Sequence, residues 1–149
     1  IQKKINDLGY SFKHELINAS PLVPQKRIRC YMVCIRDTKE KFEFPDISGD
    51  PIQLKSILQK RVDAKYTISD RLWEGHQRRT ARNLERGTGF TAFCADLKKP
   101  ANTLVARYGK DGKECLIPQK GKNPRMLTPE ECSRLQGFPK KFICVGAKF

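Results

Sequence analysis

The stretch Gln25-Lys26-Arg27-Ile28-Arg29-Cys30-Tyr31-Met32-Val33-Cys34-Ile35 places a short basic segment directly before an apolar one. Residues 28–36 are apolar on both faces over their centre, which predicts a buried strand. Residues 11–18 are also strand-like, and Pro21 and Pro24 interrupt the chain between the two segments. This pattern predicts an antiparallel strand pair joined by a long, proline-stiffened loop.

The alternation of Gln25, Arg27 and Arg29 at the entrance to the second strand forms a candidate anion-binding site. Alternate residues of an extended strand face the same side, so we expect the two guanidinium groups to point together. In that arrangement they are able to bind a phosphate or an exposed carbonyl oxygen.

The overall composition points to a polyanionic partner. The chain has 149 residues, enough for one ordinary domain or one domain with a tail, and 30 Lys and Arg against 16 Asp and Glu give a net charge of +14. No apolar run approaches the roughly 20 residues that span a bilayer, so we expect no transmembrane helix, no signal peptide and no membrane partner. Because the chain opens at Ile1 in the middle of a pattern, we interpret it as a fragment of something longer.

The cysteines and histidines do not form a pattern typical of a metal site. No Cys-x-x-Cys pair occurs, and Cys30 and Cys34 lie too far apart along a strand to bridge comfortably. We expect no metal, and mostly buried, reduced thiols in a cytoplasmic protein. His14 and His76 have no partner in the sequence that suggests a ligand set or a catalytic triad, so we expect surface or sheet residues.

The middle of the chain begins with a polar stretch, residues 37–49, where we place a domain boundary. A short amphipathic helix is predicted for residues 52–61, and a longer one is predicted from the N-cap Ser69 to about Arg86, with Gly87 as its stop. Projected at about 100° per residue, the longer helix carries one stripe of arginines: Arg71, Arg78, Arg79, Arg82 and Arg86. Its other side is expected to carry Trp73, Thr80, Ala81 and Leu84.

Such an arginine face is often merely solvated, but two features favour binding. Few acids are available to pair with the stripe, and five further cations crowd the segments that follow: Lys98, Lys99, Arg107, Lys110 and Lys113. Backbone phosphates satisfy such a surface and release counterions, and arginine also offers the planar fork that binds guanine in a major groove.

The last third of the chain is expected to be largely extended, with a helix near its end. Residues 87–94 and 103–108 read as short strands, and extended structure resumes at residues 114–117, which predicts a hairpin around Lys110. The run Thr128-Pro129-Glu130-Glu131 is typical of a helix start, and that helix is expected to stop near Gly137.

Two of these segments resemble motifs of DNA cytosine-5 methyltransferases. The run from Asn18 to Ile35 closely resembles the family's Gln-x-Arg-x-Arg motif, and residues 125–139 resemble its Arg-x-Leu-x-Pro-x-Glu-x-x-Arg-x-x-Gly-Phe/Tyr-Pro motif. The spacer between them is similar to a bacterial subgroup that carries Gly87-Thr88-Gly89-Phe90 and then Thr103-Leu104-Val105-Ala106-Arg107-Tyr108-Gly109-Lys110-Asp111-Gly112. The resemblance covers nearly the whole chain.

The resemblance implies an α/β fold of the α+β kind: an antiparallel strand pair from a Rossmann-like methyltransferase sheet, plus a small mixed α/β target-recognition domain. Residues 1–45 then end the catalytic domain, residues 46–124 form the target-recognition domain, and residues 125–149 return as helix and strand toward the catalytic domain. The implied reaction moves a methyl group from S-adenosylmethionine to carbon 5 of a cytosine flipped out of duplex DNA.

The resemblance also assigns roles to residues. Gln25, Arg27 and Arg29 would support the active site, with Arg29 near the carbonyl oxygen of the flipped base and a flanking phosphate. Arg125, Pro129 and Glu131 match the motif that braces the recognition domain. The expected DNA-binding residues come from the long helix and from the recognition loop: Arg78, Arg79, Arg82, Thr103, Leu104, Arg107, Tyr108 and Lys110.

The glycine-rich cofactor loop, the Pro-Cys nucleophile motif, the Glu-Asn-Val motif and the closing Gly-Asn-Ser segment of the family have no counterpart in this sequence. We therefore expect the fragment to be inactive alone, with S-adenosylmethionine bound by an N-terminal catalytic half or a complementary subunit. Two alternatives stay open: a stand-alone basic nucleic-acid-binding module, and the smaller subunit of a split methyltransferase.

Overall fold

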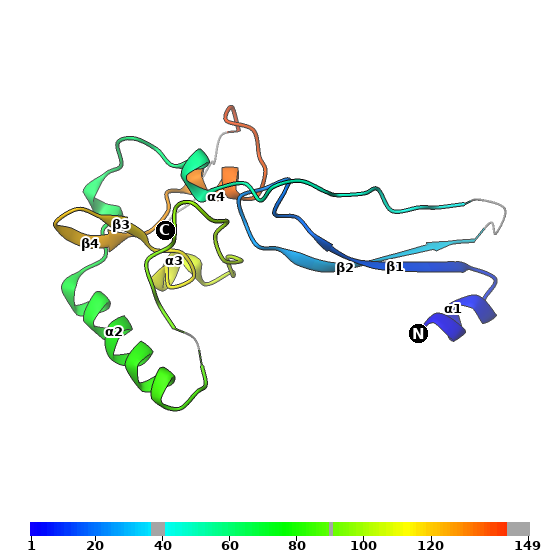
Figure 1. Cartoon of the computed structure of the whole chain (residues 1–149), viewed down its shortest axis with the longest axis horizontal. Helices are drawn as coiled ribbons and strands as arrows, with labels where there is room; N and C mark the ends of the chain where they lie inside the picture. The colour runs from blue at the N-terminus through cyan, green and yellow to red at the C-terminus, as the bar shows by residue number, and fades with distance from the viewer. Residues whose placement is uncertain (37–40, 90, 143–149) are drawn as a thin grey trace.

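The computed structural model describes residues 1–36, 41–89 and 91–142. Figure 1 shows a long strand pair on one side and a more compact part on the other. The strand pair consists of β1 (Ser11–Asn18) and β2 (Ile28–Ile35), and the short helix α1 (Gln2–Asp7) precedes it. The compact part contains η1 (Leu54–Ile57), η2 (Ala64–Tyr66), α2 (Asp70–Glu85), α3 (Tyr108–Asp111), β3 (Ile117–Gln119), β4 (Lys122–Arg125) and α4 (Pro129–Leu135).

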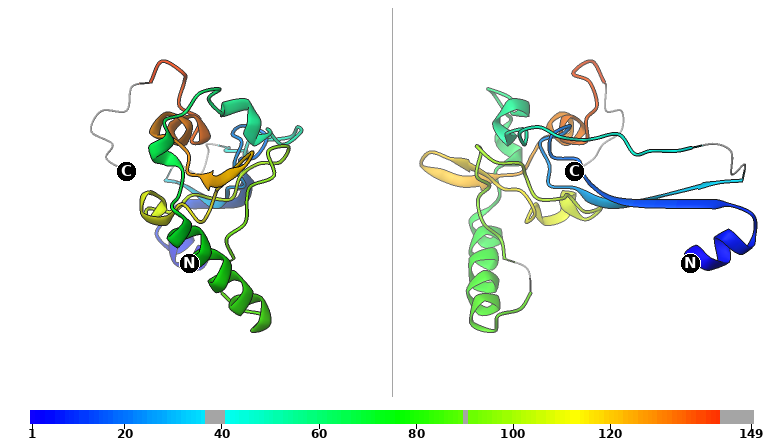
Figure 2. Two further views of the ribbon diagram at one scale, coloured as in Figure 1. Left: turned by 90° about the vertical axis from the view of Figure 1, so that its left-hand side faces the viewer. Right: turned by 45° about the vertical axis from the view of Figure 1, so that its right-hand side comes forward.

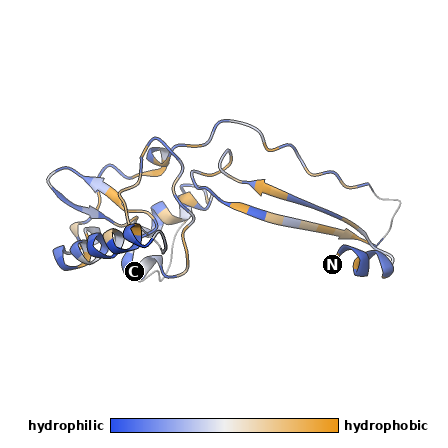
Figure 3. Ribbon diagram, turned by 60° about the horizontal axis from the view of Figure 1, so that its bottom comes forward, coloured by the Kyte–Doolittle hydropathy of each residue, from blue (hydrophilic) through white to orange (hydrophobic). Residues whose placement is uncertain are grey.

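The predicted antiparallel pair is confirmed, with Ser11 opposite Ile35 and Asn18 opposite Ile28. The prediction that the second strand is buried is wrong for this chain, since Ile28 is 58% exposed and Met32 is 56% exposed. Apolar residues lie along the pair in Figure 3, and the extended segment 41–51 runs alongside it (Figure 1). Both α/β character and antiparallel pairing agree with the expected fold class; membership of a Rossmann-like sheet stays a prediction.

The core lies in the compact part and draws on elements from both sides of the expected boundary at residue 124. Its buried residues are Leu54, Ala101, Tyr108, Cys115, Ile117, Leu127 and Leu135. Leu135 comes from α4 and Leu54 from η1, so the helix after the spacer packs into the same core as the spacer itself. The domain boundaries therefore stay predictions, and the strand expected near the C-terminus lies outside the described residues.

Helix α2 forms where the sequence predicts it. Ser69 caps its first turn by accepting a hydrogen bond from the backbone N–H of Leu72 at 3.3 Å, and Gly87 follows the helix with φ of +61°. Figures 1 and 2 show the helix extending out of the compact part. Its buried residues are His76 and Thr80, whereas Ala81 and Leu84 are exposed, which corrects the expected apolar side.

His76 is 2% exposed, so the expectation of a surface or sheet position is wrong for it. Its Nε2 lies 2.9 Å from the backbone oxygen of Asp111, which ties α2 to α3. His14 lies exposed on β1, as expected. The Thr80 hydroxyl accepts from the backbone N–H of Ala92 at 2.9 Å, and these two contacts hold the inner face of α2 against the compact part.

Several local predictions in the second half are wrong. The helix expected at residues 52–61 shortens to a single 3₁₀ turn, η1. The described residues of 87–94 contain no strand, and residues 103–108 form a loop that enters α3. The hairpin lies at β3 and β4, around Lys120 and Gly121, and not around Lys110. Tertiary contacts override local strand propensity here, because the aromatic side chain of Tyr108 is drawn into the core.

The predicted C-terminal helix start is confirmed as α4, with Pro129 as its first residue. Thr128 and Glu131 form a reciprocal capping box, in which each side chain accepts from the other residue's backbone N–H. The expectation of mostly buried thiols is wrong, because three of the five described cysteines are exposed: Cys30, Cys34 and Cys94.

Candidate nucleic-acid interface

The Gln25 segment and the expected recognition loop are joined by backbone hydrogen bonds. The N–H of Lys26 donates to the carbonyl of Ala101 at 2.8 Å, and the N–H of Ala101 donates to the carbonyl of Pro24 at 2.9 Å. The hydroxyl of Thr103 donates to the carbonyl of Lys26. We call this set of contacts the junction. It links two segments about 75 residues apart in the chain, which places the two expected functional regions side by side.

Gln25 and Arg27 lie together at the junction. Gln25 is fully buried, and the Arg27 guanidinium donates to its side-chain oxygen at a long 3.5 Å. Arg29 is exposed on β2, with its guanidinium donating to the neighbouring carbonyl of Ile28 at 2.7 Å. Gln25 thus lies buried at the strand entrance, whereas Arg29 presents an accessible cation.

The recognition-loop residues divide into anchors and exposed groups. Thr103 belongs to the junction, and Leu104 packs against the core. Arg107 and Lys110 are exposed and available to a polyanion. Tyr108, in contrast, is 3% exposed, so its side chain cannot reach DNA in this arrangement, which corrects that expectation.

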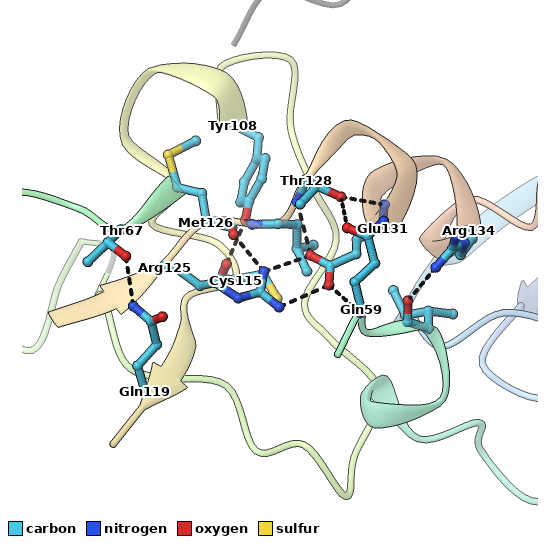
Figure 4. A network of polar contacts seen from close by, with 12 residues as sticks. Gln59, Thr67, Tyr108, Cys115, Gln119, Arg125, Met126, Thr128, Glu131 and Arg134 are labelled. Atoms are coloured by element: carbon cyan, nitrogen blue, oxygen red, sulfur yellow. Dashed lines mark hydrogen bonds and ion pairs between the residues drawn. The ribbon is translucent and has the colours of Figure 1, made fainter. Parts of the chain in front are cut away.

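The hydroxyl of Tyr108 organises the core. It donates to the carbonyl of Cys115 at 2.7 Å and accepts from the backbone N–H of Leu127 at 2.7 Å (Figure 4). Burial, reinforced by the nearby Cys115, raises the pKa of Tyr108 well above its ordinary value. Burial also raises the pKa of Cys115 to about 12, with a further contribution from the charge of Glu131. Both groups stay protonated at neutral pH and act through packing and hydrogen bonds.

Arg125 and Glu131 form a buried ion pair in the compact part. Their two-pronged contact has nitrogen–oxygen distances of 2.7 and 2.9 Å, and the side chains are 8% and 0% exposed. The Glu131 carboxylate also accepts from the backbone N–H of Gln59 at 2.8 Å and of Thr128 at 3.0 Å. Figure 4 shows this network tying β4, α4 and the segment after η1 together. The structure thus brings Arg125 and Glu131 together, with Pro129 in the same first turn of α4 as Glu131.

Gln59 is a member of this network that sequence reasoning missed. Its side-chain oxygen accepts from the hydroxyl of Thr128 at 2.9 Å, and it lies 72 residues from Glu131 in the chain. No local pattern marks this position. Lys26 lies in the basic segment but is not among the expected site residues, although its backbone is the centre of the junction.

The arginines of α2 form an exposed face. Arg78, Arg79 and Arg82 are all exposed, and none of the ion pairs among the described residues involves them. Figure 3 shows the helix as predominantly hydrophilic. Unpaired cations on one helix face form the kind of surface that phosphates neutralise.

A polar hollow of about 250 Å³ lies beside the junction. Its walls include Lys26, Lys99, Lys113, Asn102 and Glu114. Lys99 pairs with Asp96 in the same wall at 3.6 Å, so part of its charge is already balanced. In the part of the chain that the structure describes, no group of three or more His, Cys, Asp or Glu side chains is arranged to hold a metal ion. No described helix is long and apolar enough to cross a membrane.

Comparison with known proteins identifies methyltransferases that are similar to this chain. The chain is 45% identical over 149 residues to the Type II methyltransferase M.SsoII of Shigella sonnei, covering 96% of the chain and 39% of the relative. It is 43% identical over 144 residues to M.DsaV of Dactylococcopsis salina, covering 93% and 41%. The chain thus spans about two fifths of the length of these relatives.

The fold is similar to that of solved methyltransferases. The S. pombe Dnmt2 methyltransferase matches 97% of this chain and 50% of its own, with a TM-score of 0.72 at 14% identity. The model of the family described as "C-5 cytosine-specific DNA methylase" matches residues 1–148. The chain therefore belongs to the C-5 cytosine-specific DNA methylase family.

Proposed function

We propose that this chain is the DNA-recognition half of a DNA cytosine-5 methyltransferase, the enzyme that methylates carbon 5 of a cytosine flipped out of duplex DNA. The junction carries the proposal. Because Lys26 is bonded on both sides to Ala101 and Thr103, a displacement of the recognition loop is transmitted to the strand that carries Arg27 and Arg29. Recognition of the target and placement of the flipped base then become mechanically coupled.

In this proposal Arg29 binds the carbonyl oxygen of the flipped cytosine and a flanking phosphate. Its exposure at the start of β2 supports the role, and Gln25 and Arg27 hold the strand entrance in place. A charge-assisted hydrogen bond from a guanidinium is among the stronger polar contacts, and its directionality suits the positioning of a base.

The exposed cations supply most of the affinity for duplex DNA. Arg107 and Lys110 contact bases or phosphates from the recognition loop, and Arg78, Arg79 and Arg82 contact phosphates from α2. Tyr108 does not take part directly: it holds the loop from below through its two hydrogen bonds. The Arg125–Glu131 pair braces the same region.

S-adenosylmethionine is the methyl donor of this enzyme family in general. The residues described here do not fit it: none of the glycines with positive φ lies directly between the end of a strand and the first turn of an α-helix, where nucleotide-binding loops are found. We therefore assign cofactor binding and the nucleophile to the N-terminal half or a complementary subunit, which acts together with this chain on duplex DNA.

A chimera tests the proposal. The part of M.SsoII that this chain matches is replaced by this chain, and transfer of tritiated methyl groups to duplex DNA is measured beside that of the parent enzyme. We expect methylation by the chimera and none by the chain alone. Methylation by the chain alone would contradict the assignment of the nucleophile to the other half.

Binding by the isolated chain provides a second test. Duplex affinity is expected to fall by an order of magnitude or more between about 50 and 200 mM salt. Salt-independent binding, or a clear preference for single-stranded RNA, would favour a stand-alone nucleic-acid-binding module. An inactive chimera together with absent duplex binding would refute the proposed function.

A further inference from the structure

The β3–β4 hairpin is fixed at its base by side-chain amides. The Gln119 amide nitrogen donates to the hydroxyl of Thr67 at 3.0 Å and to the carbonyl of Asn123 at 2.7 Å. The Asn123 amide nitrogen donates to the carbonyl of Ile68 at 3.2 Å and to the carboxylate of Asp70 at 2.6 Å. The hairpin is thereby attached to the chain segment that leads into α2.

Backbone contacts reinforce this attachment. The N–H of Ile68 donates to the carbonyl of Pro124 at 3.1 Å, and the N–H of Met126 donates to the carbonyl of Tyr66 at 2.9 Å. The segment before α2 therefore lies against β4 like a third strand. The orientation of the hairpin relative to the start of α2 is set by main-chain pairing as well as by the amides.

The tip of the hairpin reaches into open space. Gly121 has φ of +68°, and a Cβ atom placed on it would meet no atom within 4 Å. Figure 1 shows the hairpin at the end of the molecule opposite α1, and Figure 2 (right) shows it projecting beyond the start of α2. The tip is thus a rigidly based projection that contributes no side chain to the core.

Cationic residues lie at the tip of the hairpin and beside its base. Lys120 and Lys122 are exposed on either side of the turn glycine, and Arg71 is exposed at the start of α2. The side chains of Asp70 and Asn123 are hydrogen-bonded to each other, and these two residues are the chain neighbours of Arg71 and Lys122 respectively. Within the described ranges, none of the three cations forms an ion pair. We call Arg71, Lys120 and Lys122 the hairpin cluster.

We propose that the hairpin cluster is a phosphate-binding site for the backbone of duplex DNA, separate from the recognition loop and the strand entrance. This inference deepens the proposed function and rests on it. The cluster adjoins the start of α2, a helix whose 16 residues extend about 24 Å and which carries the exposed Arg78, Arg79 and Arg82 further along, so a duplex that contacts the cluster has more cations within reach along the helix. Because the base of the hairpin is already ordered, binding immobilises only the lysine side chains.

The salt dependence of binding tests the inference. In the double variant Lys120→Ala/Lys122→Ala, the logarithmic slope of affinity against salt is expected to fall by about 1.8, which corresponds to two phosphate contacts at about 0.9 each. The matched control is Lys3→Ala/Lys4→Ala on α1, which removes the same charge from exposed positions at the opposite end of the molecule. The control is expected to keep the slope of the unchanged protein.

Three outcomes separate this inference from the proposed function. A lower slope for the hairpin variant alone supports the inference, and restoration of the slope by Lys120→Arg/Lys122→Arg identifies charge as the cause. Equal slopes for the hairpin variant and the α1 control overturn the inference but leave the proposed function standing, provided that the unchanged protein binds duplex DNA. Absence of duplex binding by the unchanged protein overturns the inference, and together with an inactive chimera it overturns the proposed function as well.

Discussion

Removal of the Glu131 carboxylate is expected to destabilise the compact part strongly. The substitution Glu131→Ala leaves the guanidinium of Arg125 buried without its counter-ion, since that side chain is only 8% exposed. It also removes the acceptor for the backbone N–H groups of Gln59 and Thr128. Breaking a buried pair by removing one partner costs about 3–5 kcal/mol in the free energy of unfolding. A loss of that size is a large fraction of the roughly 5–15 kcal/mol that stabilises a domain.

Urea unfolding followed by circular dichroism measures this loss of unfolding free energy. In a thermal melt, the roughly 2–4 °C per kcal/mol typical of chains this long predicts a fall in Tm of about 6–20 °C. Glu130→Ala is the control, because Glu130 lies on the same first turn of α4 but is exposed. The free energy of unfolding of Glu130→Ala is expected to fall by no more than about 1 kcal/mol, the usual contribution of an acid at a helix N-terminus.

A double variant separates the buried charge from the lost packing. In Arg125→Met/Glu131→Leu no uncompensated charge remains, so this protein is expected to be more stable than Glu131→Ala. It should still be less stable than the unchanged protein, because two N–H groups have lost their acceptor, at about 1–3 kcal/mol each. A loss below about 1 kcal/mol for Glu131→Ala, or a double variant less stable than that single variant, would refute the reasoning.

Three further predictions concern the interface and the core. Tyr108→Phe is expected to lower the free energy of unfolding in urea by about 1–3 kcal/mol, because two buried partners lose their hydrogen bond, and to leave the duplex affinity of the folded protein unchanged. Weaker duplex binding without any loss of stability would show that Tyr108 contacts DNA directly. In the active chimera, Arg29→Ala is expected to lower methyl transfer far more than duplex binding, whereas Lys98→Ala changes binding slightly and sequence choice not at all. Equal losses of methyl transfer and of binding for Arg29→Ala would show that Arg29 is only a phosphate contact. Iodoacetamide at pH 8 is expected to label the exposed Cys30 in the native protein but Cys115 only after unfolding, because burial and a raised pKa keep Cys115 a protonated, inaccessible thiol. Detection of the label on Cys115 of the native protein by mass spectrometry would contradict this prediction.

Signals that act over a few residues were sufficient to predict some elements. Ser69 before α2 and the Thr128–Glu131 capping box before α4 stabilise helix starts through contacts within three residues, so their chemistry is visible in the sequence. The β1–β2 pair is similarly predicted by apolar composition and by the prolines between the strands. The two ordered motifs identified the family, because their residue types and spacing are properties of the sequence itself.

Segments with weak local preferences were decided by their surroundings. Residues 103–108 have the composition of a strand, yet the chain turns into α3 so that Tyr108 can fill the core and bond to Cys115 and Leu127. Gly112 then accepts the left-handed conformation at the end of α3, with φ of +63°, where a Cβ atom would lie 2.6 Å from Met126. Burial of one aromatic side chain outweighs the small strand preference of its neighbours.

Composition and local pattern were sufficient to predict the charge, the cap residues, the strand pair and the family. Only the tertiary structure placed Lys26 against Ala101 and Thr103, and Glu131 against Gln59. These partners are more than 70 residues apart, so no periodicity or spacing along the chain encodes their contact. Their positions follow from the closing of one shared core around residues from distant segments, which fixes at once the junction, the brace below it and the direction in which the cations face.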